Sequence, residues 1–485
     1  MNKEENIECC WTVCSDCFGR GKKTRKLKMK AKLLYQLELD QFEQKKEGAS
    51  LPVRPKGQLF TCPKCQGCGI VSSETFPEPD SVNYPNVAIV GGGIGGVALA
   101  VACLHRGIPF TLYERDKDFS NRSQGYGLTL QQATKAIKGL GILSLPNAVV
   151  STRHVVHTPE GKVVGEWGMR KWVQADGKSP AKKTNMHIAR QSLRGALLEQ
   201  LGEQKNIQWD HQLIDFSQNK EKQWDLNFLV NGEVKTEKAD LVVGADGIRS
   251  TVRKIVIGEE TTPLQYLGCI VILGICQLDD LQSVESELLD SETVFQTANG
   301  HERIYVMPYD DTSVMWQLSF PIPEVEAKIM SSKGVHALKE EAIRKTDWHD
   351  PIPQIIAATP EARISGYPVY DRELLNVEWL SKKGNCTLLG DAAHPMSPFK
   401  GQGANQALLD ALSLARGISF GCRPFSNWRA AGLRTSVLQA FESEMVERST
   451  IKVQDSAEAA QFLHSEVALY EGNEPRGRCL KRKES

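Results

Sequence analysis

Short apolar runs and helical patterns alternate along much of the chain. Residues 87–90 form a continuous apolar run that predicts a buried strand, and residues 97–105 repeat their apolar positions with a helical period. A second apolar strand is predicted over residues 110–114. Two further runs, 239–244 and 386–390, also predict buried strands. The early strand–helix–strand order indicates a βαβ unit and an α/β fold.

Two other stretches, residues 149–172 and 266–320, alternate between apolar and polar positions. Alternation with a period of two is typical of half-buried strands, so these stretches predict a mostly antiparallel sheet. Residues 436–470 are predicted to form C-terminal helices. The polar and basic residues 471–485 predict a disordered tail, because they offer little apolar surface to bury.

Composition sets the frame for these elements. With 485 residues, 41% hydrophobic and 24% charged, the chain can bury a large core and form more than one domain. Equal numbers of basic and acidic residues, 59 of each, give no reason to expect a nucleic-acid or membrane partner. No stretch approaches the roughly 18 apolar residues of a spanning helix, and the polar start is unlike a signal peptide. We therefore expect a cytoplasmic protein without a membrane span.

A glycine-rich turn joins the first strand to the first helix. Gly91, Gly93 and Gly96 occupy the positions of the G-x-G-x-x-G fingerprint, with Ile94 and Gly95 between them. Glycine lets a pyrophosphate approach the backbone closely, and the helix N-terminus offers N–H groups to the anion. The turn therefore predicts a dinucleotide site.

The second strand ends in a carboxylate about 20 residues beyond the glycines, where dinucleotide folds bind a ribose hydroxyl. Glu114 is therefore the predicted ribose ligand, and Arg115 beside it belongs to the same predicted site. The alternative is a glycine-rich turn followed by an unrelated surface acid.

Two later segments follow buried strands in the same way, Ala245-Asp-Gly-Ile-Arg-Ser250 and Gly390-Asp-Ala-Ala-His-Pro395. Three such segments in this order point to a flavoprotein. Asp391, at a strand end, can accept a hydrogen bond from the ribityl chain. The helix start near Gly401 to Asn405 would place N–H groups beside the flavin pyrimidine, where a reduced flavin carries negative charge. His394 is expected to be structural, because nothing nearby in sequence completes an acid–base pair.

The three segments resemble those of the single-component flavin-dependent aromatic hydroxylases, the para-hydroxybenzoate hydroxylase-like family. Within it, the run from Pro398 to Asn405 is most similar to the tetracycline-inactivating monooxygenases, and the likeness covers most of residues 86–470. The family's Asp-Gly motif lies near the FAD pyrophosphate and the path of NAD(P)H. This implies cofactor contacts for Asp246 and Arg253.

The same resemblance implies that Arg122 lies near flavin N5 as a catalytic residue and that Arg190 contacts FAD. Either arginine is otherwise an ordinary surface residue or helix cap. The complete predicted FAD site comprises Gly91, Gly93, Ile94, Gly95, Gly96, Glu114, Arg115, Arg122, Arg190, Asp246, Arg253, Gly390, Asp391, Pro398, Gly401, Gly403, Ala404 and Asn405.

The chemistry implied by the resemblance uses FAD, NAD(P)H and O2. NAD(P)H reduces FAD, dioxygen adds at flavin C4a, and the hydroperoxide hydroxylates or epoxidises an aromatic or polyketide-like small molecule. No second glycine fingerprint follows Gly96, which fits transient binding of NAD(P)H. An FAD-dependent oxidase or reductase is one alternative. A halogenase is another, although residues 316–321 lack the W-x-W-x-I-P motif expected there.

Seven of the 13 cysteines lie in the first 68 residues, and four form two copies of C-x-x-C-x-G-x-G. Two such pairs supply four thiolates in tetrahedral geometry, so Cys14, Cys17, Cys62 and Cys65 are the predicted ligands of one Zn2+ ion. A redox-active dithiol is the alternative, since C-x-x-C also tunes thiol reactivity. Unrelated thiols are a third alternative, which the repeated motif disfavours relative to the other two.

The repeated motif resembles the cysteine-rich zinc module of DnaJ-type chaperones, where it occurs in sets of four. Two copies imply one ion. The resemblance also suggests that this module binds a protein partner. From another functional class, the alternative is a zinc-module chaperone or scaffold with a vestigial flavin domain.

These features predict a Rossmann-like FAD-binding domain with an inserted, mostly antiparallel substrate sheet, C-terminal helices and a small cysteine-rich module. The expected boundaries are 1–75 for the zinc-binding module, 76–85 for a linker, 86–148, 186–264 and 371–420 for the FAD-binding domain, 149–185 and 265–370 for the substrate domain, 421–470 for the C-terminal helices and 471–485 for the disordered tail.

Overall fold

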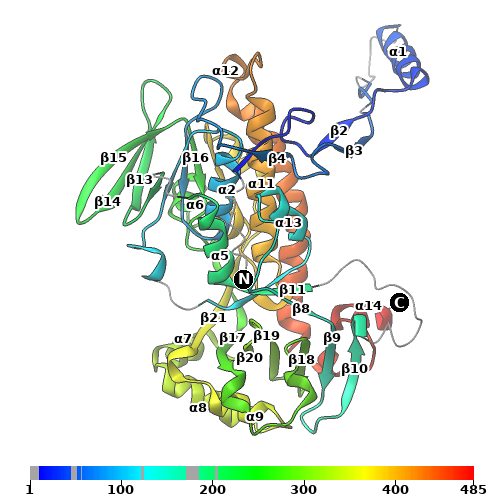
Figure 1. The fold of residues 1–485 in the computed structure, drawn as a ribbon, viewed down its shortest axis with the longest axis vertical. Coiled ribbons are helices and arrows are strands. Elements are labelled where there is room, and N and C mark those ends of the chain that lie inside the picture. The colour runs from blue at the N-terminus through cyan, green and yellow to red at the C-terminus, as the bar shows by residue number, and fades with distance from the viewer. Residues whose placement is uncertain are drawn as a thin grey trace, which may run out of the picture.

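The computed structural model describes residues 10–44, 52–55, 57–121, 125–170, 185–202 and 206–484. A five-stranded parallel sheet forms its centre, with the strand order β12-β6-β5-β16-β22 (Figure 1). Its strands are β5 (Val87–Val90), β6 (Phe110–Tyr113), β12 (Ile207–Gln208), β16 (Leu241–Gly244) and β22 (Cys386–Leu388).

Helices pack against this sheet and against one another. Every residue of α2 (Ile94–Leu104) is buried, because the helix is apolar on all sides and lies between the sheet and α11 (Gly403–Gly421). The other helices of this part are α3 (Thr134–Gly139), α5 (Arg190–Glu199), α6 (Thr251–Val256), α10 (Val377–Ser381), α12 (Trp428–Ala431) and α13 (Gln439–Phe462).

A seven-stranded sheet with the order β10-β9-β18-β19-β20-β17-β21 forms the second layer. Its strand pairs are antiparallel except for β9 with β18. The strands are β9 (Arg153–His157), β10 (Val163–Trp167), β17 (Leu264–Gln277), β18 (Thr293–Ala298), β19 (Arg303–Pro308), β20 (Ser313–Pro321) and β21 (Ile364–Arg372).

One face of this sheet is covered by three helices, which share a core with Trp316 and Phe320 (Figure 1). They are α7 (Glu324–Ser332), α8 (Val335–Lys345) and α9 (Ile352–Ala358). Two small antiparallel sheets complete this part: β7 (Gly127–Leu130), β8 (Val149–Ser151) and β11 (Asn185–Ala189) form one, and β13 (Gln212–Gln218), β14 (Trp224–Val230) and β15 (Glu233–Ala239) form the other.

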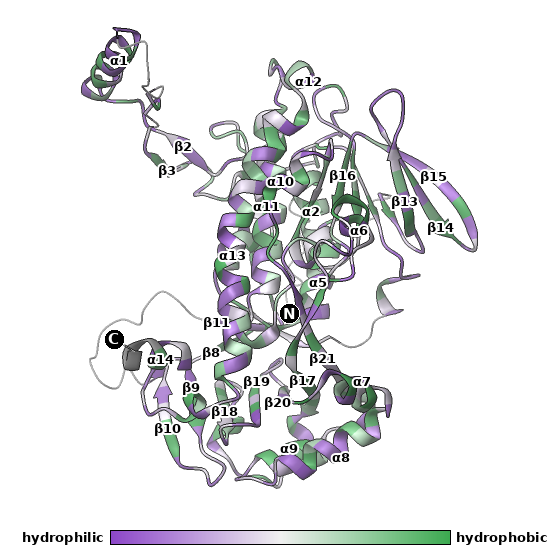
Figure 2. Cartoon of the chain, turned by 180° about the vertical axis from the view of Figure 1, so that it is seen from behind, coloured by the Kyte–Doolittle hydropathy of each residue, from purple (hydrophilic) through white to green (hydrophobic). Residues whose placement is uncertain are grey.

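The N-terminal module consists of two short antiparallel strand pairs and a helix. β1 (Cys10–Val13) pairs with β4 (Ile70–Ser73), and β2 (Lys22–Thr24) pairs with β3 (Leu59–Thr61). The helix α1 (Met29–Gln44) stands away from the rest of the chain and carries both hydrophilic and hydrophobic residues (Figure 2).

The end of the chain differs from the expected disordered tail. Gly472 N donates to Val164 O at 3.0 Å, and Glu166 N donates to Asn473 Oδ1 at 3.1 Å. The helix α14 (Arg476–Glu484) follows. Polar composition favoured disorder, but hydrogen bonds to β10 anchor this segment.

Among the residues described, each helix is too short or too polar to cross a bilayer.

Candidate active site

Two adjoining cavities lie beside the carboxyl ends of the parallel strands. The small cavity, about 190 Å³, is lined by the ends of β5 and β6 and the start of α2. The large cavity, about 760 Å³, is lined mainly by β7, the seven-stranded sheet and residues 395–404. The cavities share the walls formed by Arg115, Tyr126, Leu128, Asp246, Gly247, Arg249, Asp391, Gly403 and Ala404.

The glycine turn shapes one end of the small cavity. Gly91 has φ +107°, and a Cβ there would lie 2.5 Å from Ala245 O, so a side chain is excluded. A Cβ at Gly96 would overlap Gly91 O. Gly247 lines the cavity with open space at its Cβ position, and a Cβ at Gly93 would meet only Arg190 Nη2, at 3.9 Å. The bare start of α2, where Gly93 offers no side-chain cap, therefore fits a pyrophosphate.

Glu114 holds the glycine turn as well as lining the small cavity. Gly92 N donates to Glu114 Oε2 at 2.7 Å, and Asp116 N donates to Glu114 Oε1 at 3.1 Å. Arg194 Nε donates to Gly92 O at 2.7 Å, and its Nη2 lies 3.9 Å from Glu114 Oε2. The carboxylate is 6% exposed. The predicted ribose ligand thus also fixes the backbone that would receive the phosphates.

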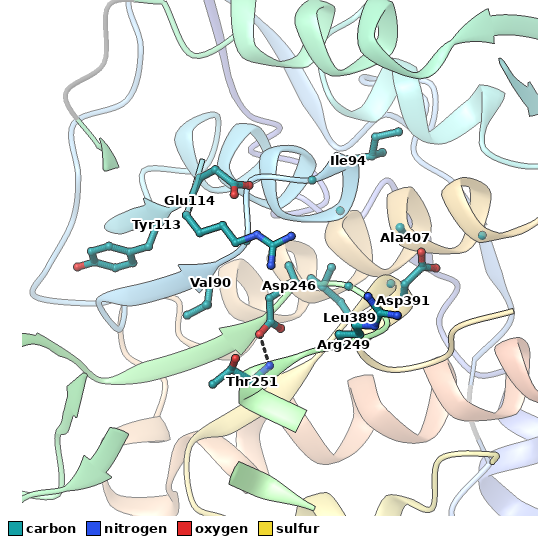
Figure 3. A pocket seen from close by; sticks show the side chains of 18 of the residues that line it. Val90, Ile94, Tyr113, Glu114, Asp246, Arg249, Thr251, Leu389, Asp391 and Ala407 are labelled. Carbon is teal, nitrogen blue, oxygen red and sulfur yellow. Dashed lines mark hydrogen bonds between the residues drawn. The ribbon is translucent and has the colours of Figure 1, made fainter. Parts of the chain in front are cut away.

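Asp246 lies opposite Glu114, as Figure 3 shows, and Asp391 faces the same cavity from the third segment. Thr251 N donates to Asp246 Oδ2 at 2.7 Å, and Ser250 Oγ donates to Asp246 Oδ1 at 2.5 Å. Burial raises the pKa of Asp246, although these hydrogen bonds oppose the rise. Asp246 therefore orders the start of α6 at the cavity wall.

The side chain of Arg253 lines neither cavity and instead donates hydrogen bonds to other residues of the chain. It is 2% exposed, and its Nη1 donates to Ala392 O at 3.0 Å and to Ala393 O at 2.8 Å. Its Nε donates to Thr262 Oγ1 at 3.0 Å. Arg253 thus ties the second segment to the third.

Asn405, like Arg253, forms hydrogen bonds with the protein backbone and lines neither cavity. Its Oδ1 accepts from Gln131 N at 2.8 Å and Ala133 N at 3.2 Å, and its Nδ2 donates to Thr129 O and Gly401 O, both at 2.8 Å. The side chain is fully buried. It holds β7 and the following turn against the start of α11.

His394 lies in a buried ion-pair network behind the third segment. Its Nε2 lies 2.6 Å from Asp410 Oδ2, which also accepts from Gly390 N, and Arg448 Nη2 donates to Asp410 Oδ1 at 2.7 Å. Burial would raise the pKa of Asp410, but His394 and Arg448 outweigh it and hold that pKa below its usual value. Asp410 is thus an acid–base partner for His394 that the sequence did not reveal.

Most predicted site residues come together around the two cavities. These are Gly91, Gly93, Ile94, Gly95, Glu114, Arg115, Arg190, Asp246, Gly390, Asp391, Pro398, Gly401, Gly403 and Ala404. Gly96, Arg253 and Asn405 line neither cavity, and Arg122 lies outside the described residues. Sequence reasoning missed Tyr126 and Arg249, which line both cavities.

The large cavity contains a buried cation that the sequence did not reveal. Arg303 is 5% exposed, and its Nε donates to Gln296 Oε1 at 2.9 Å. Its guanidinium lies 5.0 Å from the centroid of the Tyr305 ring. Burial lowers the pKa of Arg303 to about 10, so the group is charged at neutral pH, and Tyr305, not a carboxylate, is the group that opposes this lowering among the described residues. Tyr367 and Phe399 add aromatic surface to the same cavity.

Four cysteines gather in the N-terminal module. The sulfur atoms of Cys14, Cys17, Cys62 and Cys65 lie within 4.8 Å of one another, and all four residues are buried. Cys14 and Cys62 Sγ are 3.9 Å apart, and Cys17 and Cys65 Sγ are 3.6 Å apart. Four Zn–S bonds of about 2.3 Å give a tetrahedron with edges of about 3.8 Å, which these separations match.

Backbone groups support the same four sulfurs. Gly21 N donates to Cys17 Sγ and Gly69 N donates to Cys65 Sγ, each at 3.2 Å. N–H groups directed at sulfur stabilise thiolates. The donor set therefore fits one tetrahedral metal ion.

Comparison with known proteins identifies the fold. A family model described as an FAD binding domain matches residues 84–423. Aurachin C monooxygenase/isomerase of Stigmatella aurantiaca is 30% identical over 341 residues, which cover 69% of this chain and 80% of that protein. The 3-amino-4-hydroxybenzoate 2-monooxygenase PtmB3 of Streptomyces platensis is 27% identical over 348 residues, with 69% and 80% coverage.

A solved structure extends the comparison. Tetracycline destructase Tet(51) superposes with a TM-score of 0.57 at 18% identity, over 82% of this chain and 95% of that chain. This similarity shows a shared fold. The family match over more than half of the chain and the 30% identical relative show that the protein is an FAD-dependent oxidoreductase belonging to the FAD-binding monooxygenase family.

Proposed function

We propose that this FAD-dependent monooxygenase takes electrons from NAD(P)H and inserts one atom of O2 into an aromatic or polyketide-like molecule with an acidic oxygen. The observation that carries the proposal is the large cavity, about 760 Å³, which shares walls with the small cavity and is lined by the buried guanidinium of Arg303. A cavity of this size holds a multi-ring ligand.

The residues around the small cavity fit FAD. The start of α2 and the glycine turn would hold the pyrophosphate, and Glu114 would hold the ribose. Asp391, Arg190 and the start of α11 would contact the rest of the cofactor. When bound, FAD supplies the transfer of electrons from the nicotinamide to O2 and the delivery of oxygen to the substrate.

The chain's own residues orient the substrate and exclude water. Arg303 would bind a carboxylate, phenolate or enolate oxygen, and Gln296 keeps the guanidinium in position. Tyr367 and Phe399 would pack on the planar rings. The Streptomyces platensis relative is a 3-amino-4-hydroxybenzoate 2-monooxygenase, and an acidic aromatic substrate of that kind supports this substrate class.

The proposal also assigns one Zn2+ ion to Cys14, Cys17, Cys62 and Cys65, since four buried sulfurs at tetrahedral separations leave no open coordination position. A structural zinc site of this type has no ligand position for a substrate.

The test uses the purified full-length protein. We expect a flavin absorption spectrum, about one zinc per chain by elemental analysis, and oxidation of NADPH or NADH that acidic phenols and polyketides stimulate with little release of hydrogen peroxide. Oxidation that no compound stimulates, with all reducing equivalents recovered as peroxide, would make the protein an oxidase and overturn the proposed hydroxylation.

A further inference from the structure

Two helices connect the small cavity with the cysteine cluster. The first turns of α2 and α11 line the cavity through Ile94, Gly95, Gly403 and Ala404. Their opposite ends face the N-terminal module, and Figure 1 shows β4 of this module beside them. Each helix carries one arginine at that end: Arg106 follows α2, and Arg416 lies in the second half of α11.

Both arginines contact the turns that carry the cysteines. Arg416 Nη2 donates to Gly67 O at 2.9 Å and to Cys68 O at 2.8 Å. A Cβ placed on Gly19 would lie 3.5 Å from Arg106 Nε, so this guanidinium lies against the first cysteine turn.

Neither guanidinium has a carboxylate partner within the part of the chain that is described. Arg106 is 2% exposed, and its Nε and Nη2 lack hydrogen-bond partners there, as does the buried Nε of Arg416. Arg106 Nη1 donates to Ala102 O, at the C-terminal end of α2. The dipole of a helix end contributes only about half an elementary charge, so most of the positive charge is uncompensated. Burying such a charge without a counter-ion is unfavourable.

The cysteine cluster supplies the missing charge when it binds its ion. Four thiolates and one Zn2+ carry a net charge of −2, which equals the charge of the two guanidinium groups with opposite sign. We propose that the metal-loaded cluster of Cys14, Cys17, Cys62 and Cys65 is the counter-ion of Arg106 and Arg416, so that metal binding docks the N-terminal module onto the ends of α2 and α11. The proposal rests on the zinc site assigned above.

Electrostatic docking of this kind would connect the N-terminal module to the helices that line the small cavity. Arg20 of the module stacks on Phe420 of α11 at 4.2 Å and Arg20 Nε donates to Cys17 O at 3.4 Å, which adds a contact on the same face. Because the far ends of α2 and α11 line the small cavity, loss of the metal is expected to loosen FAD as well as the module.

The experiment compares zinc affinity in the full-length protein and its variants by competition with a chromophoric chelator. Arg106→Met and Arg416→Met should each weaken zinc binding about tenfold or more, because methionine keeps much of the volume and removes the charge. Arg423→Met is the matched control, since Arg423 stacks on the same Phe420 ring at 4.2 Å but donates to Phe420 O, at the end of α11, rather than to the cysteine turns. Its zinc affinity should stay at the wild-type value.

A measurement on the wild-type protein covers the case that a variant fails to fold. Removal of zinc by chelation should speed amide hydrogen exchange in residues 100–107 and 411–421 and raise the dissociation constant of FAD. Unchanged zinc affinity in both methionine variants, or unchanged exchange after chelation of a protein that had held one zinc, would overturn the docking proposal alone. A wild-type protein that binds no zinc would instead overturn the zinc assignment, and the docking proposal with it.

Discussion

Replacing Gly96 by alanine tests whether the glycine turn must keep its closed shape to bind FAD. The new Cβ would overlap Gly91 O and lie 3.1 Å from Gly91 C and 3.3 Å from Ala245 Cβ. Gly91 cannot yield easily, because its N–H donates to Tyr113 O at 2.8 Å within the sheet. Overpacking of this kind costs about 1–3 kcal/mol. If about 2 kcal/mol of this cost is lost from the free energy of FAD binding, FAD binds about 30-fold more weakly.

The assay titrates the flavin-free protein with FAD and uses the quenching of flavin fluorescence to measure binding. A denaturant unfolding curve measures the stability of the same protein. Gly195→Ala is the control, because Gly195 lies inside α5 and a Cβ there meets its nearest neighbour, Phe119 Cζ, at 3.6 Å. That change should leave FAD binding intact and stabilise the helix by about 0.5–1 kcal/mol. A Gly96→Ala protein with wild-type FAD affinity and an unchanged unfolding midpoint would refute the reasoning.

Three further changes probe the rest of the structure. Arg253→Met should destabilise the fold by about 2–4 kcal/mol in urea unfolding, because it leaves Ala392 O and Ala393 O without their donor; a midpoint equal to the wild type would contradict this. Burial raises the pKa of Asp371 to about 6, so proton binding favours the folded state and its stability falls as the pH rises from about 4 to 6. Asp371→Asn should therefore gain up to about 3 kcal/mol at pH 8 and nothing at pH 3, measured by unfolding at both values. Arg303→Met should raise KM for acidic substrates about tenfold and leave neutral analogues unaffected; equal losses on both would rule out charge recognition.

Local patterns were sufficient to predict the parts of the site that depend on backbone shape. Gly91 and Gly93 were found because a strand, a turn and a helix are consecutive in sequence, and that order specifies where the backbone N–H groups point. The cysteine pairs were found for the same reason, since both copies of the motif are short and regular.

Side-chain roles that depend on distant partners could not be predicted. Arg253 and Asn405 stand in flavin-associated segments, yet they donate to or accept from backbone groups more than 130 residues away. Arg303 was missed because its position over the large cavity depends on the register of β18, β19 and β20, which no pattern of alternation determines. The anchored tail was missed because its hydrogen bonds are to β10.

The anchored end of the chain bears on how such an enzyme diversifies. Leu463, Pro475 and Gly477 help to enclose the large cavity, while no residue after Ala407 lines the small one among those described. These three residues also lie beyond the segment that matches the family model, which ends at residue 423. Substitutions after residue 462 can therefore change which molecules the large cavity accepts without altering a residue that lines the small one.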